Sequence, residues 1–121
     1  MKSMTIILAD DHPLLLNGTK EYLQKSGYQV INTAINGNDA YNNILRQQPD
    51  YAILDFDMPK LNGLEIAQAI KRYKLPTKVI ILSLYKQESI VSEVGITIDG
   101  YLTKDSAMEE LNTCMYYTEI G

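Results

Sequence analysis

The chain has 121 residues, of which 45% are hydrophobic and 21% charged, a composition that suits one folded domain and argues against a disordered chain. Its net charge of −4 and its lack of any basic run argue against nucleic-acid binding by this segment itself, because phosphate contacts require clustered Lys and Arg. The single cysteine, Cys114, cannot form an intrachain disulfide, which favours the cytoplasm, and no apolar run approaches the ~20 residues of a membrane span.

The first half of the chain alternates two strands with two helices. The apolar run from Met4 to Asp10 predicts a strand, and Pro13 then opens a helix to about Lys25, because its missing N–H costs little in a first turn. Gly27 suits the left-handed residue that ends such a helix. A strand over Gln29–Ala34 follows and, after an Asn-Gly-Asn turn, a helix continues to about Gln48.

The middle of the chain carries the most apolar strand. Tyr51–Asp55 is an almost continuous apolar run, as expected of a strand that is buried on both faces. Apolar residues at helical spacing over Leu64–Lys74 predict the next helix, and a strand over Lys78–Leu82 follows it.

The last third combines a weak helix with a final strand and helix. We expect a short, weakly held helix over about Gln87–Val94, because two turns of helix are unstable without packing. An extended stretch should follow to Gly100, because Ile96-Thr97-Ile98 is β-branched throughout. Gly100–Thr103 is the fifth strand, and Ser106 can cap the last helix, with Glu109 three residues on.

Strands that alternate with helices predict a parallel sheet that is covered on both faces. Right-handed crossovers leave few topologies for five strands, and the common solution is the flavodoxin-like order 2-1-3-4-5. We therefore predict one α/β domain over residues 1–121, a (βα)5 three-layer sandwich.

Polar residues stand where four of the predicted strands end. Asp10 and Asp11 follow the first strand, Asp55 ends the third, Ser83 follows the fourth, and Lys104 follows the fifth. In an open parallel sheet, the carboxyl ends of the strands lie along the edge that binds ligands. We therefore expect three carboxylates, a hydroxyl and an ammonium group to converge there.

These residue types suit phosphoryl transfer. A carboxylate can attack phosphorus and form an aspartyl phosphate, although both partners are negative. Asp10, Asp11 and Asp55 would repel one another without a cation, and a cluster of carboxylates and waters is what Mg²⁺ prefers. Lys104 adds a fixed positive charge, and Ser83 can donate a hydrogen bond to a phosphoryl oxygen.

Each of these residues also has a purely structural interpretation. An Asp-Asp pair after a strand often caps the next helix, a lone serine such as Ser83 does the same, and a lone lysine such as Lys104 is usually a solvated surface residue. The ordered set of all four positions favours the functional interpretation. His12, the only histidine, is predicted on the rim of the site and is left out of the predicted metal ligands.

The motifs resemble the receiver domain of two-component response regulators over nearly the whole chain. The similarity rests on the acidic pair Asp10-Asp11, on Asp55 within Leu54-Asp55-Phe56-Asp57-Met58-Pro59, on Leu61-Asn62-Gly63, on Ser83, and on Tyr101 and Lys104 in Gly100-Tyr101-Leu102-Thr103-Lys104. Asp10-Asp11-His12-Pro13-Leu14 and Ser83-Leu84-Tyr85 are similar to the LuxR/NarL/FixJ-type subgroup.

The resemblance implies a role for each site residue. Asp55 would accept the phosphoryl group, and Lys104 would be the family's invariant lysine. The side chains of Asp11 and Asp55 and the backbone carbonyl of Asp57 would bind Mg²⁺, with Asp10 acting through a water molecule. Ser83 and Tyr101 would be the switch residues.

The resemblance also implies partners. A sensor histidine kinase or phosphotransfer protein would supply the phosphoryl group, phosphorylation could drive homodimer formation, and the only catalysis would be self-phosphorylation and self-dephosphorylation. In this subgroup a helix-turn-helix domain usually follows and binds DNA to regulate transcription; we expect it to be absent here, since the chain ends at Gly121. Many receivers have Lys-Pro with a cis peptide bond after the fifth strand, whereas Lys104-Asp105 offers no such bias.

Two other functions stay open at this point. Asp55-Phe56-Asp57 also resembles the first motif of haloacid-dehalogenase-type phosphatases, but that family places its nucleophile on the first strand and an acidic motif after the lysine. The chain could also be a receiver-like scaffold that binds proteins without being phosphorylated.

Overall fold

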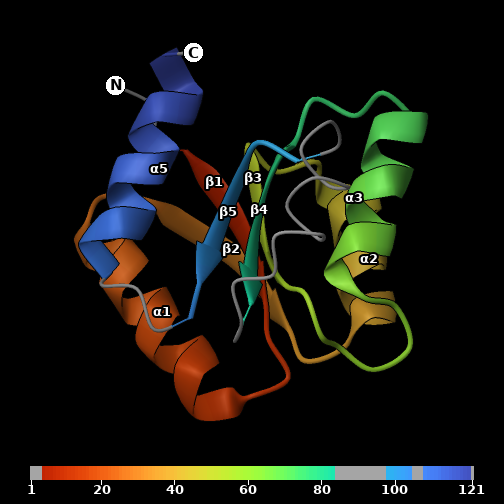
Figure 1. Ribbon diagram of the computed structural model, residues 1–121, viewed down its shortest axis with the longest axis horizontal. Helices are drawn as coiled ribbons and strands as arrows, with labels where there is room; N and C mark the ends of the chain where they lie inside the picture. Colours follow the sequence, from red (N-terminus) through yellow and green to blue (C-terminus); the bar gives the residue numbers. More distant parts are fainter. Residues whose placement is uncertain (1–3, 84–97, 105–107, 121) are drawn as a thin grey trace.

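The computed structural model describes residues 4–83, 98–104 and 108–120. Five parallel strands form one sheet in the order β2-β1-β3-β4-β5, which confirms the predicted flavodoxin-like topology (Figure 1). The strands are β1 (Thr5–Ala9), β2 (Gln29–Ala34), β3 (Tyr51–Asp55), β4 (Lys78–Ser83) and β5 (Gly100–Thr103). The described helices are α1 (Pro13–Lys25), α2 (Gly37–Gln47), α3 (Gly63–Arg72) and α5 (Met108–Ile120).

The sheet separates two apolar layers. Helices α1 and α5 cover one face, and α2 and α3 cover the other (Figure 1). Side chains alternate between the faces along each central strand: on β3, Tyr51 and Ile53 pack with α1 and α5, whereas Ala52 and Leu54 pack with α2 and α3. All five residues of β3 are buried, as the continuous apolar run predicted.

Helix ends follow local capping chemistry. The Asn36 side chain accepts a hydrogen bond from the Asp39 amide at 2.9 Å and caps α2. Helix α2 therefore begins at Gly37, within the Asn-Gly-Asn segment that was predicted as a turn. Asn62 and Glu65 form a reciprocal capping box that starts α3 at Gly63. Gly27 has a φ of 97°, which confirms its predicted left-handed role after α1.

Three predicted boundaries shift by one or two residues. Helix α3 ends at Arg72 and not at Lys74, because Lys74 has a left-handed φ of 55° that a helix cannot contain. Strand β1 is shorter than predicted and stops at Ala9, whereas β4 is longer and includes Ser83, which pairs with Thr103 of β5.

The sheet brings distant parts of the chain together at its carboxyl edge. The Phe56 amide donates to the Leu82 carbonyl at 2.7 Å, and the Lys104 amide donates to the Ser83 carbonyl at 2.6 Å. These hydrogen bonds continue the sheet one residue past the ends of β3 and β5. The residues directly after β3 and β5 are therefore held in register with the end of β4.

Three predictions lie outside the described residues. They are the short helix over Gln87–Val94, the Ser106 cap of the last helix, and the isomer of the Lys104-Asp105 peptide bond. Within the described part of the chain, no helix combines the length and the apolar character that crossing a membrane requires.

The loop after β3 packs tightly on the start of α2. The Gly37 amide donates to the Pro59 carbonyl at 3.1 Å, and a Cβ atom on Gly37 would overlap the carbonyl oxygen of Leu61. Gly18 of α1, in contrast, has no atom within 4 Å of the place where its Cβ would lie.

We therefore predict opposite effects for two Gly→Ala changes. Gly37→Ala forces the loop away from α2 and should lower the free energy of unfolding by about 1–3 kcal/mol, as overpacking does. Gly18→Ala is the matched control and should raise it by about 0.5–1 kcal/mol, because alanine favours helix. Urea unfolding measures both, and a Gly37→Ala variant as stable as the parent would contradict the packing seen here.

Candidate phosphoryl-transfer site

Two buried aspartates form the centre of the site. Asp55, the last residue of β3, is 2% exposed, and Asp10, directly after β1, is 5% exposed. Strands β1 and β3 are neighbours with Ala9 opposite Leu54, so the two carboxylates emerge side by side. This proximity is the one that the sequence predicted from the ends of the strands.

Lys104 joins these two carboxylates. Its ammonium nitrogen lies 2.8 Å from Oδ2 of Asp55 and 3.2 Å from both carboxylate oxygens of Asp10. The Lys104 side chain is only 6% exposed, so water screens these ion pairs little. The solvated-surface interpretation of this lysine is therefore excluded.

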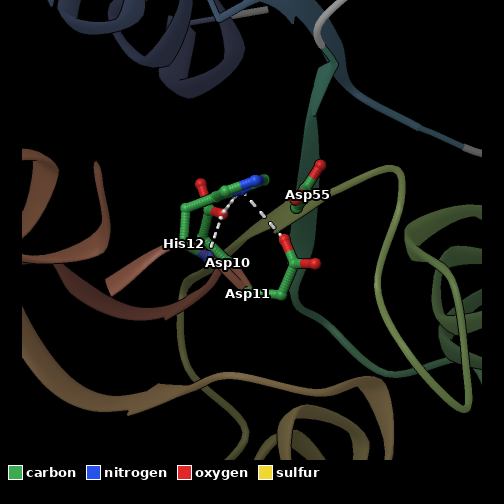
Figure 2. Close-up of side chains that lie close together, drawn as sticks. All are labelled: Asp10, Asp11, His12 and Asp55. Atoms are coloured by element: carbon green, nitrogen blue, oxygen red, sulfur yellow. Dashed lines mark hydrogen bonds and ion pairs between the residues drawn. The ribbon is translucent and has the colours of Figure 1, made fainter. Parts of the chain in front are cut away.

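His12 also reaches into the site. Its Nδ1 lies 3.0 Å from Oδ1 of Asp10 and 3.0 Å from Oδ1 of Asp11, while its side chain is 51% exposed (Figure 2). The rim position agrees with the prediction. The orientation of Nδ1 toward the carboxylates was not predicted from the sequence, although the position of His12 between an acidic pair and a helix-opening proline was a usable signal.

Asp11 carries a buried oxygen that lacks a hydrogen bond in the described part of the chain. This oxygen, Oδ1, lies at ion-pair distance from Nδ1 of His12 but without hydrogen-bond geometry. One ligand atom from each of Asp10, Asp11, His12 and Asp55 lies within 4.8 Å of the other three (Figure 2). An unsatisfied carboxylate oxygen among other oxygen donors fits a hard divalent cation such as Mg²⁺.

The remaining predicted residues lie around this centre. Asp57 has an exposed side chain, and its amide donates to Oδ1 of Asp55 at 3.2 Å, so its backbone is held next to the carboxylate. Ser83 is buried at the end of β4, beside β3. Tyr101 of β5 is half-buried against the apolar layer of α2 and α3.

The family model for the response regulator receiver domain matches residues 6–115, which include every site residue described above. The chain belongs to this family. The receiver domain is 34% identical over 112 residues to the probable transcriptional regulatory protein NarL of Mycobacterium tuberculosis, covering 91% of this chain and 52% of that protein. It is 31% identical to the nitrate/nitrite response regulator NarL of Escherichia coli, covering 97% of this chain and 55% of that protein.

A solved structure supports the same placement. The signal receiver domain of the putative response regulator NarL from M. tuberculosis superposes with a TM-score of 0.92 at 30% identity, and 98% of each chain is covered. The predicted resemblance to the LuxR/NarL-type subgroup is thus confirmed. The receiver domain spans about half the length of the curated NarL proteins that it matches.

Burial shifts the titration of the receiver's central carboxylate. Removal from water raises the pKa of Asp55 from 3.8 to about 6, and the negative charge of Asp10 adds to this effect. The hydrogen bond and charge of Lys104 act in the opposite direction but do not cancel it. Burial alone would lower the pKa of Lys104, but its contacts with Asp55 and Asp10 outweigh burial and raise it.

The raised pKa predicts that Asp55→Asn stabilises the metal-free receiver. An acid whose pKa rises from 3.8 to about 6 on folding stabilises the fold below pH 4, and this contribution is lost as pH climbs to about 6. At pH 7.5 a neutral asparagine avoids that loss, which amounts to about 3 kcal/mol at most. In urea unfolding with EDTA from pH 4 to 8, the free energies of unfolding of the parent and the Asp55→Asn variant should diverge between pH 4 and 6.

The control for this pH series is Glu21→Gln, which neutralises an exposed carboxylate of α1. It should change stability by less than about 0.5 kcal/mol throughout, as surface substitutions do. An Asp55→Asn variant that is less stable than the parent at pH 7.5 would show that the Lys104 contacts dominate over burial.

Proposed function

We propose that this receiver domain accepts a phosphoryl group on Asp55 in a Mg²⁺-dependent reaction and passes the signal on by a change of conformation. The observation that supports this most is the position of the Lys104 ammonium, 2.8 Å from Asp55 and 3.2 Å from Asp10 at the carboxyl edge of the sheet. A buried nucleophile, a fixed cation and further carboxylates together provide positioning and charge neutralisation, which are most of what phosphoryl transfer requires.

The chain's own residues would carry the reaction. A carboxylate oxygen of Asp55 forms the new bond to phosphorus, and the donor's leaving group departs with the electrons of the bond that breaks. Lys104 moves from pairing the free carboxylate to pairing a phosphoryl oxygen. Asp57 holds Oδ1 of Asp55 through its amide, which leaves Oδ2, the atom beside Lys104, as the attacking oxygen.

The metal would be held by residues that the site brings together. Asp11 and Asp55 would bind through their side chains, Asp57 through its backbone carbonyl, and Asp10 through a water molecule. When bound, Mg²⁺ would neutralise charge that builds up on the transferring phosphoryl group. The unsatisfied buried oxygen of Asp11 supports this assignment.

Ser83 and Tyr101 would convert phosphorylation into a change of surface. Ser83 would donate a hydrogen bond to a phosphoryl oxygen from the end of β4, and Tyr101 would move into the space vacated. Phosphorylation can only shift such an equilibrium by favouring one of two arrangements. The half-buried position of Tyr101 supports its role, because a half-buried ring can move inward or outward.

The partners follow from the family. The phosphoryl donor would be a sensor histidine kinase or a phosphotransfer protein in the cytoplasm, and phosphorylation could drive homodimer formation. The curated NarL relatives named above are about twice as long as this receiver domain, and they are named as a transcriptional regulatory protein and a response regulator. An output domain outside the sequence described here would bind DNA and control transcription.

The proposal predicts a single phosphorylated residue. Incubation with acetyl phosphate and Mg²⁺ should add one phosphate, detected by intact mass and removed by hydroxylamine, which cleaves acyl phosphates. Asp55→Asn should abolish this labelling, whereas Asp39→Asn, which neutralises another aspartate near the same edge, should leave it intact. Full labelling of the Asp55→Asn variant would refute the assignment.

Two further measurements, hydrolysis of a phosphate monoester and Mg²⁺ binding, separate the alternatives. Sustained release of phosphate from a phosphate monoester would favour a phosphatase, although Asp55 ends the third strand of the chain and not the first, which argues against that family. Absence of labelling in a protein that binds Mg²⁺ would favour a receiver-like scaffold that acts by protein binding alone.

The proposed metal site predicts a strong effect of Asp11. Asp11→Asn removes a charged ligand from a small site, so Mg²⁺ affinity should fall at least about tenfold, measured by calorimetry. Glu21→Gln removes the same charge from the exposed surface of α1 and should leave the affinity within about twofold. Equal affinities of the parent and the Asp11→Asn variant would place the cation elsewhere.

A further inference from the structure

We propose that His12 is a further metal ligand, which gives this site a preference for borderline transition-metal ions such as Ni²⁺ and Zn²⁺ over Mg²⁺. This inference rests on the proposed function, since it concerns the same cation site. It adds a nitrogen donor to the oxygen donors assigned above, and it makes His12 a residue that determines metal specificity.

The first support is the direction of the imidazole ring. Nδ1 lies 3.0 Å from Oδ1 of Asp10 and 3.0 Å from Oδ1 of Asp11, so it faces the carboxylates although half of the side chain is exposed (Figure 2). Neighbouring ligands of an octahedral ion, each about 2.1 Å from the metal, lie about 3 Å apart. The spacing between Nδ1 and these oxygens therefore matches that of ligands bound to one ion.

The second support is that the ring does not cap α1. His12 is the N-cap residue of α1, yet its side chain makes no capping hydrogen bond. Its backbone amide is held instead by Oδ1 of Asp10 at 2.9 Å, which fixes the start of the side chain next to the site. In the part of the chain that the structure describes, the polar contacts of the ring are with Asp10, Asp11 and Lys104.

The third support is the unsatisfied oxygen of Asp11. Oδ1 of Asp11 is buried, lies 3.0 Å from Nδ1 of His12 and has no hydrogen bond to any residue that the structure describes. A cation between these two atoms would satisfy both the oxygen and the nitrogen lone pair. Oxygen and nitrogen donors in one site suit Zn²⁺ and Ni²⁺, whereas Mg²⁺ takes oxygen ligands and keeps several waters. His12 would thus replace one of those waters when a borderline ion is bound.

Calorimetric titration of the parent and a His12→Phe variant with Ni²⁺ and with Mg²⁺ tests the preference. Loss of the imidazole should lower Ni²⁺ affinity at least tenfold more than it lowers Mg²⁺ affinity. Asn17→Ala, an exposed substitution on α1, is the matched control and should leave the ratio of the two affinities within twofold. An equal fall in the Ni²⁺ and Mg²⁺ affinities would overturn the proposal, because it would show that the substitution disturbs the whole site and does not remove a ligand specific for Ni²⁺.

Ring-nitrogen NMR tests the coordination directly. His12 is the only histidine in the chain, so ¹⁵N-labelled imidazole gives one assigned pair of resonances. One equivalent of Zn²⁺ should shift the Nδ1 resonance far more than the Nε2 resonance, and excess Mg²⁺ should reverse the shift. A ring that does not respond, or responds only at Nε2, would overturn the proposal while Mg²⁺ binding leaves the proposed function intact. Failure of the parent to bind any divalent ion would overturn both.

Discussion

The ion pairs between one ammonium and two buried carboxylates are the interaction on which this site depends. Lys104 lies within 3.2 Å of both Asp10 and Asp55, which are almost fully removed from water. Burial raises the pKa of Asp55, and the charge of Asp10 adds to this effect. Lys104 offsets part of that rise but not all of it, because the pKa of Asp55 stays raised at about 6. The site therefore retains an excess of negative charge that a divalent cation can neutralise.

The sheet topology makes this arrangement possible. Asp10, Asp55 and Lys104 come from the ends of β1, β3 and β5, and parallel pairing places all these ends at one edge. Apolar layers on both faces of the sheet bury β3 completely, so Asp55 is desolvated by the same packing that stabilises the fold. The packing that stabilises the fold therefore also raises the pKa of Asp55. A less buried carboxylate would ionise more easily, but a nearby cation or phosphoryl group would change its energy less.

The same edge connects the site to the rest of the domain. The backbone hydrogen bonds from Phe56 to Leu82 and from Lys104 to Ser83 tie the segments that follow β3 and β5 to β4. A movement of Asp55 would therefore also move residues of β4 and β5, and Tyr101 lies half-buried on β5. The start of α1 is tied to the site through Asp10, whose Oδ1 accepts a hydrogen bond from the His12 amide and lies 3.0 Å from Nδ1 of the His12 ring.

The sequence by itself determined the order of strands and helices and the polar residues at strand ends, Asp10, Asp11, Asp55, Ser83 and Lys104, because apolar periodicity and the residues at strand ends are local properties of the chain. The sheet order followed from that alternation, because right-handed crossovers leave few topologies for five parallel strands. Only the tertiary structure decided which of these groups touch. Lys104 reaches two carboxylates that are 49 and 94 residues away, and the ring of His12 turns inward. Contact distances and side-chain directions depend on register, burial and packing between elements far apart in sequence, which no local pattern encodes.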